Sequence, residues 1–318
     1  MKNFKNTFIL VTGGAGAIGS NLVKELHRRG AKLIVLDDLS SGYEDNIVDI
    51  KGIRLIKDSI SNDASLKKIF SNPVDYVFHL AASFANQKSI EDPLGDLDTN
   101  VIGTLKILQH LIKAKGLKRF IYVSSSCVYG NAGGVTAEEA ELQPQTPYAI
   151  SKLAAENYVR FFHKYYGLPA VILRYFNSYG PGEYPGKYRN VIPNFFKTAM
   201  SGFPLLITGT GEEKRSFIFV DDIVDATIKA VLKKEAIGEC FNIGSDNEIK
   251  IKDLAKKINA LTNNKAGIKL IERRKWDMIF RRIPDCKKAK KILDFNPKIT
   301  LEKGLGITYK WFLNLKKK

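Results

Sequence analysis

Short apolar runs alternate with segments of helical pattern from residue 7 to about residue 175. Helical patterns extend, for example, from Ile18 to Arg29 and from Asp96 to Lys115. Continuous apolar strands separated by helices are typical of a parallel sheet that helices cover on both faces. The alternation therefore predicts an α/β fold with a doubly wound parallel sheet. The expected strands are FILVTG (8–13), KLIVLD (32–37), IRLI (53–56), DYVFHL (75–80), RFIYVS (119–124) and AVILRY (170–175).

After about residue 176 the sequence is richer in Gly and Pro and its pattern is less regular. A chain of 318 residues is long enough for one large domain or for two closely packed ones. We expect residues 1–175 to form the domain that carries the sheet. Residues 176–318 are expected to form a smaller lobe that is partly intercalated with the first. The helices expected in this lobe lie near 188–201, 221–234, 250–262 and 301–313.

The formal net charge of +17 raises the possibility of a polyanionic partner. The excess is concentrated in residues 250–318, which hold 21 Lys and Arg against 6 Asp and Glu. No aromatic-interleaved motif of nucleic-acid binding accompanies these charges. We therefore interpret them as a solvated, lysine-rich surface and expect no nucleic-acid partner.

Other features of the sequence bear on membranes, secretion and metals. No stretch approaches the roughly 18 apolar residues of a membrane span, and the first apolar run is shorter than the about 7 to 15 residues of a secretory signal. Cys127, Cys240 and Cys286 lie far apart, without metal-binding spacing or a disulfide framework. These features predict a reduced, cytoplasmic protein with no membrane partner and no metal site.

A glycine-rich turn follows the first expected strand. Gly13, Gly16 and Gly19 form GxxGxxG between a strand and a helix, where backbone N–H groups can approach a pyrophosphate. The second strand ends at Asp37, a carboxylate that can accept both ribose hydroxyls and would repel a 2′-phosphate, so we expect NAD rather than NADP. A turn or helix-cap acid is the alternative interpretation of Asp37. Asp58, after the third strand, is a candidate for contact with the adenine.

A tyrosine and a lysine follow at helical spacing in PYAISK. Tyr148 and Lys152 are four residues apart, which places both on one face of a helix. An ammonium group beside a phenol favours the phenolate, and lowering its pKa from about 10 to near 7 requires roughly 4 kcal/mol. A tyrosine and a lysine at this spacing often occur together by chance. After a dinucleotide motif and the hydroxyl-rich strand end SSSCVYG, we interpret it as catalytic.

Seven segments together resemble the extended short-chain dehydrogenase/reductase family, and within it the nucleotide-sugar 4-epimerase and 4,6-dehydratase branch. They cover nearly the whole chain in the order and spacing of the family. The resemblance implies a Rossmann domain that binds NAD and a lobe that binds a nucleoside diphosphate sugar. It also implies a homodimer formed through the helices near 96–115 and 147–166. The segments are TGGAGAIGSNL, DDLSSG, VFHLAA, SSSCVYG, PYAISK, LRYFNSYGPG and RSFIFVDD.

The resemblance also implies roles for individual residues. Ser125, Tyr148 and Lys152 match the catalytic residues. The cofactor-binding candidates are Gly13, Gly16, Ala17, Ile18, Gly19, Asp37, Asp58, Ser59, Leu80, Ala81, Ala82, Asn100, Tyr148 and Lys152. The substrate-binding candidates are Ser125, Ser126, Asn177, Asn190, Arg215 and Arg274.

Some of these positions have ordinary alternative interpretations. Asn177, close to Gly-Pro, can simply make a turn, and Arg274 in a basic run can be solvated. Arg215 precedes an apolar strand, where an unpaired charge is costly. Two residues depart from the family pattern, since Ser216 stands where Asp is usual and Trp276 where Gly is frequent.

The positions after Ser125 separate the possible reactions. The resembling 4,6-dehydratases have Asp-Glu at the next two positions, and UDP-glucuronate decarboxylases have Glu at the second. Here these positions are Ser126 and Cys127, and neither is a carboxylic acid that could protonate a leaving hydroxyl. The sequence therefore disfavours dehydration and decarboxylation.

The function favoured by these features is an NAD-dependent nucleotide-sugar 4-epimerase, with a UDP-hexose as the expected substrate. C4 is oxidised to a ketone, the ring turns over, and hydride returns to the opposite face. The closest alternative is a 4-dehydrogenase that releases the keto sugar. A non-catalytic binding protein that contacts RNA is a third. The sequence does not identify the sugar or the nucleobase. The two arginines at positions 281 and 282 suggest a charged substituent on the sugar. The candidates for the C4–C6 side of the sugar are Ala85, Asn86, Gln87, Arg281 and Arg282.

Overall fold

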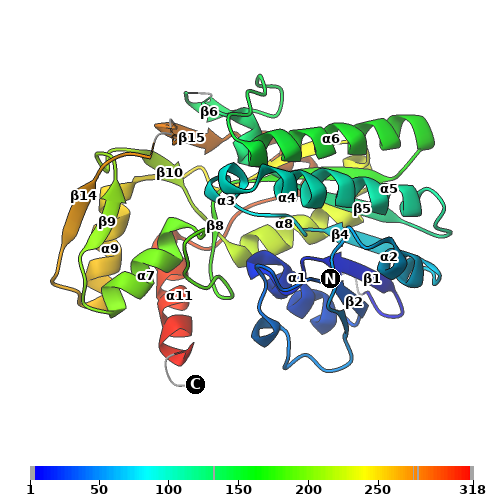
Figure 1. Ribbon diagram of the computed structural model, residues 1–318, viewed down its shortest axis with the longest axis horizontal. Coiled ribbons are helices and arrows are strands. Elements are labelled where there is room, and N and C mark those ends of the chain that lie inside the picture. Colours follow the sequence, from blue (N-terminus) through cyan, green and yellow to red (C-terminus); the bar gives the residue numbers. More distant parts are fainter. Residues whose placement is uncertain (1–3, 132, 275, 278, 316–318) are drawn as a thin grey trace.

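The computed structural model of the chain describes residues 4–131, 133–274, 276–277 and 279–315. Its central sheet has seven strands in the order β12-β7-β5-β4-β1-β2-β3, and every pair in it is parallel (Figure 1). This confirms the predicted doubly wound α/β fold. The strands are β1 Phe8–Thr12, β2 Lys32–Leu36, β3 Arg54–Ile56, β4 Tyr76–His79, β5 Arg119–Ser125, β7 Ala170–Tyr175 and β12 Cys240–Ile243.

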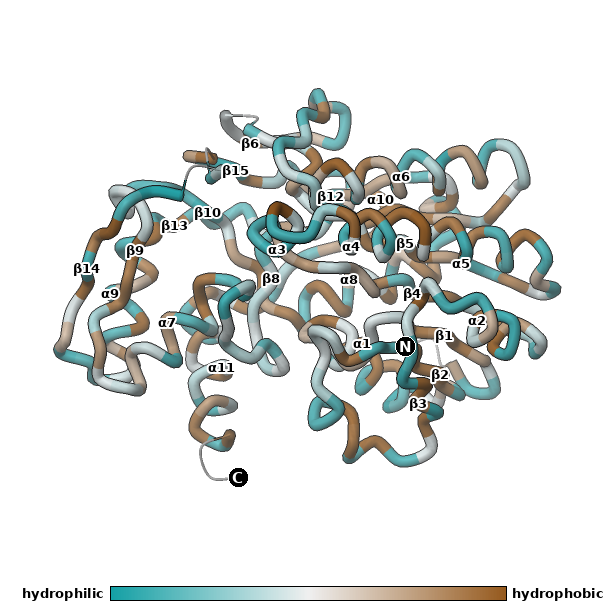
Figure 2. The backbone as a smooth tube through the Cα atoms, in the orientation of Figure 1, coloured by the Kyte–Doolittle hydropathy of each residue, from teal (hydrophilic) through white to brown (hydrophobic). Residues whose placement is uncertain are grey.

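Helices cover both faces of this sheet, and one apolar cluster fills the space on each side. The strands read as continuous apolar runs because both of their faces are buried, and every residue of β7 is buried. In Figure 2 the segments β1 and β2 are largely brown, the hydrophobic colour. The first face is covered by α1 Ala17–Arg28, α8 Val220–Leu232 and α10 Lys287–Leu293, and the second by α2 Asp63–Phe70, α5 Thr104–Leu111 and α6 Pro147–Tyr166.

The second lobe surrounds a third apolar cluster, which includes Phe196, Leu254 and Phe312. Its helices lie on the left of Figure 1. They are α7 Val191–Met200, α9 Ile251–Thr262 and α11 Leu301–Leu315. The small sheets are β9 Leu205–Thr208 with β14 Ile268–Ile271, β8 Ser178–Tyr179 with β11 Ile218–Phe219, and β13 Glu248–Lys250, β10 Lys214–Ser216, β15 Arg281–Pro284 and β6 Val135–Thr136 in that order.

The chain after residue 175 also contributes to the first domain. The strand β12 pairs with β7, and α8 packs against α1. The two parts of the chain therefore intercalate, and the domain boundary at residue 175 stays a prediction. Among the described residues, none of the helices combines the length and the apolar character that crossing a membrane requires.

Two predicted helices differ in detail from the observed ones. The helix expected from Asp96 to Lys115 is divided: α4 (Pro93–Leu97) leads into a π-helical turn, η2 (Asp98–Gly103), and α5 ends at Leu111. The wider turn places Asn100 against α6, where its side chain bonds to Ser151. The helix expected near 188–201 begins only at Val191. The remaining short helices are η1 Glu44–Asn46, α3 Asn86–Glu91, η3 Ser126–Tyr129 and η4 Lys234–Ala236.

Candidate active site

A cavity of about 1010 Å³ lies between the carboxyl ends of the sheet strands and the second lobe. Its walls come from both parts of the chain. Of the catalytic, cofactor-binding and substrate-binding residues that the resemblance implies, all except Asn100 line it, so these candidates share one space. These residues are Gly13, Gly16, Ala17, Ile18, Gly19, Asp37, Asp58, Ser59, Leu80, Ala81, Ala82, Ser125, Ser126, Tyr148, Lys152, Asn177, Asn190, Arg215 and Arg274.

The turn from β1 to α1 brings its backbone close to neighbouring segments. Gly13 has a φ of +69°, and a Cβ on it would lie 2.6 Å from the backbone nitrogen of Ala81. A Cβ on Gly19 would lie 2.1 Å from the carbonyl oxygen of Gly13. The helix α1 begins after Gly16 with no side-chain cap and no acidic residue in its first turn. Its unpaired N–H groups therefore suit an anionic pyrophosphate.

We expect Gly19→Ala to abolish dinucleotide binding, because the added methyl group cannot fit beside the Gly13 carbonyl unless the turn moves. The measurement is the nicotinamide dinucleotide content of the purified, denatured protein. Gly306→Ala is the matched control, since a Cβ there would meet nothing within 4 Å. A Gly19→Ala protein that retains a full equivalent of dinucleotide would contradict this account of the turn.

Asp37 follows β2 at the edge of the cavity, as the sequence predicted. One carboxylate oxygen accepts a hydrogen bond from the Ala15 N–H at 2.8 Å, and the other accepts one from the Leu39 N–H at 2.9 Å. Burial raises the pKa of the Asp37 carboxyl group, and these two N–H groups oppose the shift. A carboxylate offers about four acceptor positions, so Asp37 retains capacity for ribose hydroxyls.

Asp58 and Asn100 hold protein groups with their side chains. The Asp58 carboxylate lines the cavity and accepts a hydrogen bond from the Asn62 amide at 2.8 Å. Asn100 is buried outside the cavity lining. Its Oδ1 accepts a hydrogen bond from the Ser83 N–H at 2.8 Å, and its Nδ2 donates to Asp96 at 2.9 Å. Asn100 therefore holds the wall of the cavity in place, and a direct contact with the cofactor stays a prediction.

Ser125, Tyr148 and Lys152 meet at the carboxyl end of β5. The Ser125 side chain interacts with the Tyr148 hydroxyl and acts to lower the pKa of Tyr148. Lys152, one turn further along α6, donates from Nζ to the Val123 carbonyl at 2.5 Å. The same ammonium group lies 4.4 Å from the centroid of the Tyr122 ring. This arrangement can deliver a base and a hydroxyl to one alcohol of a substrate.

Burial dominates the electrostatics of this group. It raises the pKa of Tyr148, although the Ser125 side chain acts to lower it. Burial also lowers the pKa of Lys152 to about 7, while the carboxylates of Asp96 and Glu156 oppose that shift. The sequence predicted a lysine that favours the phenolate, but in the protein alone burial outweighs any such effect. The positive charge of an oxidised nicotinamide ring would lower the pKa of Tyr148.

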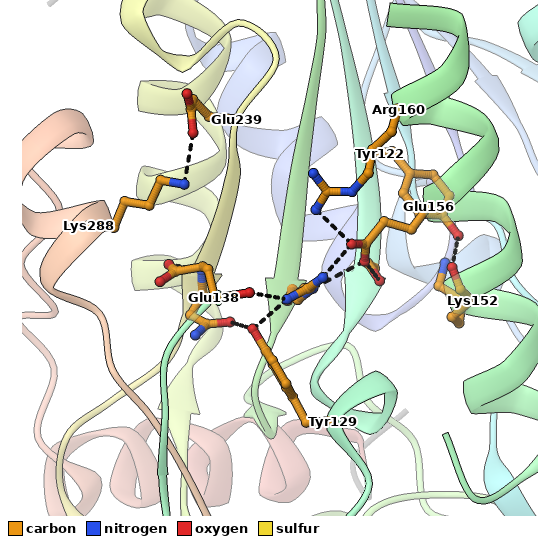
Figure 3. Close-up of polar contacts among 11 residues, drawn as sticks. Tyr122, Tyr129, Glu138, Lys152, Glu156, Arg160, Glu239 and Lys288 are labelled. Atoms are coloured by element: carbon orange, nitrogen blue, oxygen red, sulfur yellow. Dashed lines mark hydrogen bonds and ion pairs between the residues drawn. The ribbon is translucent and has the colours of Figure 1, made fainter. Parts of the chain in front are cut away.

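A buried polar network lies next to the carboxyl end of β5 (Figure 3). Glu156, fully buried on α6, contacts Arg174 of β7 at 2.5 Å, and it accepts a hydrogen bond from Ser124 at 2.9 Å. Arg174 also donates to the Tyr129 hydroxyl at 2.7 Å. Arg160 also contacts this carboxylate, at 2.9 Å, and a dashed line in Figure 3 marks the contact. The network connects β5, α6 and β7 beside the catalytic candidates.

Asn177 and Arg215 lie on the second-lobe side of the cavity. The Asn177 side chain donates to the Ser216 carbonyl at 2.8 Å, and its backbone has a φ of +25°. The Arg215 guanidinium donates to the Ile279 carbonyl at 2.7 Å. Each group retains further hydrogen-bonding capacity, so a contact of either with the substrate stays a prediction.

The other two substrate candidates have different surroundings. Asn190 donates from Nδ2 to Glu183 at 2.8 Å, and the Arg274 guanidinium stacks 5.6 Å from the ring centroid of Trp276. The sequence did not single out Glu183. It is buried in the cavity wall, and this burial raises the pKa of its carboxyl group to about 7. No signal marked it, because burial of a loop side chain depends on packing between distant segments.

The fold and the cavity together define a class of protein. A parallel sheet with a glycine-rich turn at a helix N-terminus, and a serine, tyrosine and lysine at the end of β5, form the site of a dinucleotide-dependent enzyme that moves hydride. The chain belongs to the NAD-dependent epimerase/dehydratase family, whose model matches residues 9–244. This membership confirms the predicted family and its cofactor, NAD.

Similar proteins differ in the reactions that their names state. An epimerase from Methanothermobacter thermautotrophicus superimposes with a TM-score of 0.96 at 45% identity, over 99% of this chain and 94% of the other. The UDP-glucose 4-epimerase of Thermotoga maritima, solved with UDP-glucose, gives 0.93 at 36% identity, over 98% and 100%. A UDP-N-acetyl-alpha-D-glucosaminuronate decarboxylase of Bacillus cytotoxicus is 36% identical over 95% of this chain and 97% of its own length.

Proposed function

We propose that this protein is a nucleotide-sugar 4-epimerase that retains its NAD through the catalytic cycle, with a UDP-linked hexose as substrate. The observation that carries the proposal is the absence of a carboxylic acid at Ser126 and Cys127, beside a complete set of Ser125, Tyr148 and Lys152. The closest alternative, a 4-dehydrogenase, requires the same three residues and differs only in releasing the keto sugar.

When NAD is bound, its nicotinamide would supply the acceptor for the hydride of C4. Tyr148 takes the proton of the C4 hydroxyl, and Ser125 holds that hydroxyl by a hydrogen bond. Lys152, fixed by the Val123 carbonyl, supplies positive charge near the phenolate. The glycine turn and Asp37 would hold the pyrophosphate and the ribose of the cofactor. The 4-keto sugar turns over about its diphosphate linkage and is reduced on the other face.

The residues after Ser125 also support the proposal by their contacts. Ser126 is buried, and the Cys127 thiol has only two weak polar neighbours among the described residues, the Asn86 amide and an Arg282 nitrogen, each at 3.8 Å. Cysteine is a weak acid by comparison with Asp or Glu, so it is a poor donor for a leaving hydroxyl at neutral pH. Loss of water from C5 and C6 would therefore lack its acid.

The experiment that tests the proposal is proton NMR of the purified protein with UDP-, dTDP- and GDP-sugars and no added NAD. Absorbance of reduced nicotinamide is followed in parallel. Catalytic conversion of one sugar to its C4 epimer would support the proposal. A burst of reduced nicotinamide that stops near one equivalent per protein, without an epimer, would favour the 4-dehydrogenase.

We expect Asp96→Asn to move the alkaline limb of the pH profile of kcat/KM to lower pH. The Asp96 carboxylate raises the pKa of Lys152, which burial otherwise lowers, so its removal lets the ammonium group lose its proton at lower pH. The charge of Lys152 supports Tyr148 only while the amine is protonated, so activity is lost as pH rises through its pKa. An unchanged alkaline limb would contradict a role for the Lys152 charge.

We also propose that the protein is a cytoplasmic homodimer. The outer surfaces of α4 and α6 expose large apolar side chains, among them Leu94, Leu97, Ile150 and Phe161. Leu94 is 77% exposed and Ile150 is 54% exposed. Adjacent apolar side chains of this size on exposed helices are typical of an interface. Sedimentation of the purified protein tests the proposed homodimer.

A further inference from the structure

We infer that Arg282 binds a carboxylate attached to a carbon next to C4. The substrate would then be a nucleoside diphosphate sugar that carries a carboxylate. The carboxylate could be C6 of a uronate, attached at C5, or part of an acidic ether at C3. The inference rests on the proposed oxidation at C4, because that reaction decides which end of the sugar lies at Ser125.

Arg282 is a buried cation without a counterion among the described residues. It lines the cavity and is 5% exposed. Its Nε and Nη1 are buried and have no hydrogen-bond partner in the described part of the chain. Its Nη2 lies 3.8 Å from the sulfur of Cys127, which is only a weak acceptor. A buried guanidinium in this state is costly for the protein alone, and an acidic ligand would remove that cost.

The neighbouring arginine shows the opposite behaviour. Arg281 precedes Arg282 on β15, so its side chain points to the other face of the strand. Its Nε donates to Glu248 at 2.8 Å, and the side chain is 38% exposed. The sequence suggested both arginines as partners of a charged substituent, but only Arg282 is directed into the cavity.

The position of Arg282 selects the part of the substrate that it can reach. Cys127, which its guanidinium touches, donates its backbone N–H to the Ser125 hydroxyl at 3.2 Å. In the proposed reaction Ser125 holds the C4 hydroxyl, so Arg282 lies near the C3, C4 and C5 side of the ring. The diphosphate is attached at C1, on the far side of the ring. Arg282 is therefore poorly placed for a phosphate.

The guanidinium group also favours a carboxylate over a neutral hydroxyl. Nη2, which lies against the weakly accepting Cys127 sulfur, forms a planar fork with Nε on one side and with Nη1 on the other, and either fork matches the two oxygens of a carboxylate. A hydroxyl would satisfy one donor and leave the charge uncompensated. The strand register pairs Arg282 with Arg215, whose guanidinium lies 3.7 Å from the Asp277 carboxylate, so the neighbour of Arg282 in the register offers it no negative charge. Both features give an acidic sugar an advantage over a neutral one.

Turnover of the ring limits when the contact can form. When the keto sugar turns over about the axis through C1 and C4, the substituents on C3 and C5 exchange sides. Arg282 therefore meets the carboxylate in one of the two ring orientations, and the ion pair has to break in each cycle. We expect loss of the arginine to raise KM for the acidic sugar more than it lowers kcat.

The experiment compares acidic and neutral substrates in matched pairs. UDP-glucuronate is compared with UDP-glucose, and UDP-N-acetylmuramate with UDP-N-acetylglucosamine, so that carboxylates at C5 and at C3 are distinguished. The proteins are the holoenzyme, Arg282→Met, and Arg281→Met as the matched control. The readouts are kcat/KM for each sugar, the identity of the product by NMR, and the Kd of UDP alone.

For the unmodified holoenzyme we expect kcat/KM to be about 100-fold higher for the acidic member of at least one pair. Arg282→Met should remove this preference while the Kd of UDP stays the same, and Arg281→Met should behave like the unmodified protein. An unmodified holoenzyme that prefers neutral sugars would overturn the inference without recourse to any variant. An equal loss for acidic and neutral sugars in Arg282→Met, or weaker UDP binding, would also overturn it.

The identity of the product distinguishes a failure of this inference from a failure of the proposed function. An acidic sugar that is turned over with the arginine-dependent preference, but gives a free 4-keto sugar or a decarboxylated pentose, would leave the substrate class standing and contradict the epimerase. Efficient epimerisation of a neutral sugar would support the proposed epimerase and contradict the inferred acidic substrate.

Discussion

Tyr148→Phe is expected to lower turnover by several orders of magnitude while NAD stays bound. The variant removes the hydroxyl that the proposal assigns as the base, from a buried position beside Ser125. General base catalysis contributes about 10²- to 10⁴-fold, and the loss should approach the upper end of this range. The measurement is kcat with the best sugar of the NMR panel, together with the NAD content of the protein.

Tyr179→Phe is the control for this substitution. Tyr179 is also buried, but it lies outside the cavity lining and donates to the Leu301 carbonyl at 3.2 Å. Its replacement should leave turnover nearly unchanged. Near-normal activity in Tyr148→Phe would mean that the phenol is not the base.

Glu156→Gln is expected to destabilise the fold by about 3 to 5 kcal/mol, the usual cost of removing one partner of a buried ion pair. Arg174, 1% exposed, would lose the carboxylate at 2.5 Å and stay buried with its charge. Burial acts to raise the pKa of Glu156, but Arg174 and Arg160 outweigh it and lower that pKa below 4.5. The stability from this carboxylate is therefore present above its unfolded pKa and is lost as pH falls through the folded value.

Arg160→Ala is the matched control for the ion pair. Arg160 contacts the same carboxylate at 2.9 Å, but its side chain is 42% exposed, and such pairs contribute at most about 1 kcal/mol. Denaturant unfolding of the two variants at neutral pH is the measurement. Equal and small effects of both substitutions would show that the network contributes little to the stability of the fold.

The regular elements of the first domain were predictable because their burial is regular. The strand AVILRY is buried at every position and matches β7 at both ends, and PYAISK begins α6 as its spacing indicated. The glycine turn could be predicted because a steric requirement leaves few residue types possible at Gly13 and Gly19. These features depend on local geometry, which a single sequence records.

Other features depend on contacts between distant segments, which a single sequence does not record. Arg282 faces the cavity because β15 lies beside β10 in a particular register, and a shift by one residue would present Arg281 instead. Asn100 holds Ser83 because a π-helical turn rotates it inward. The partners of these side chains are remote in the chain, so their roles emerge only from the folded structure.

The most direct test of the central claim is the fate of the hydrogen on C4. The substrate is the sugar that the NMR panel identifies, labelled with deuterium at C4, and the holoenzyme receives no added NAD. We predict that the epimer carries the deuterium at C4, because one bound nicotinamide removes it and returns it to the opposite face. An epimer that has exchanged this deuterium for solvent hydrogen, or a labelled reduced nicotinamide that accumulates beside a released ketone, would contradict the mechanism.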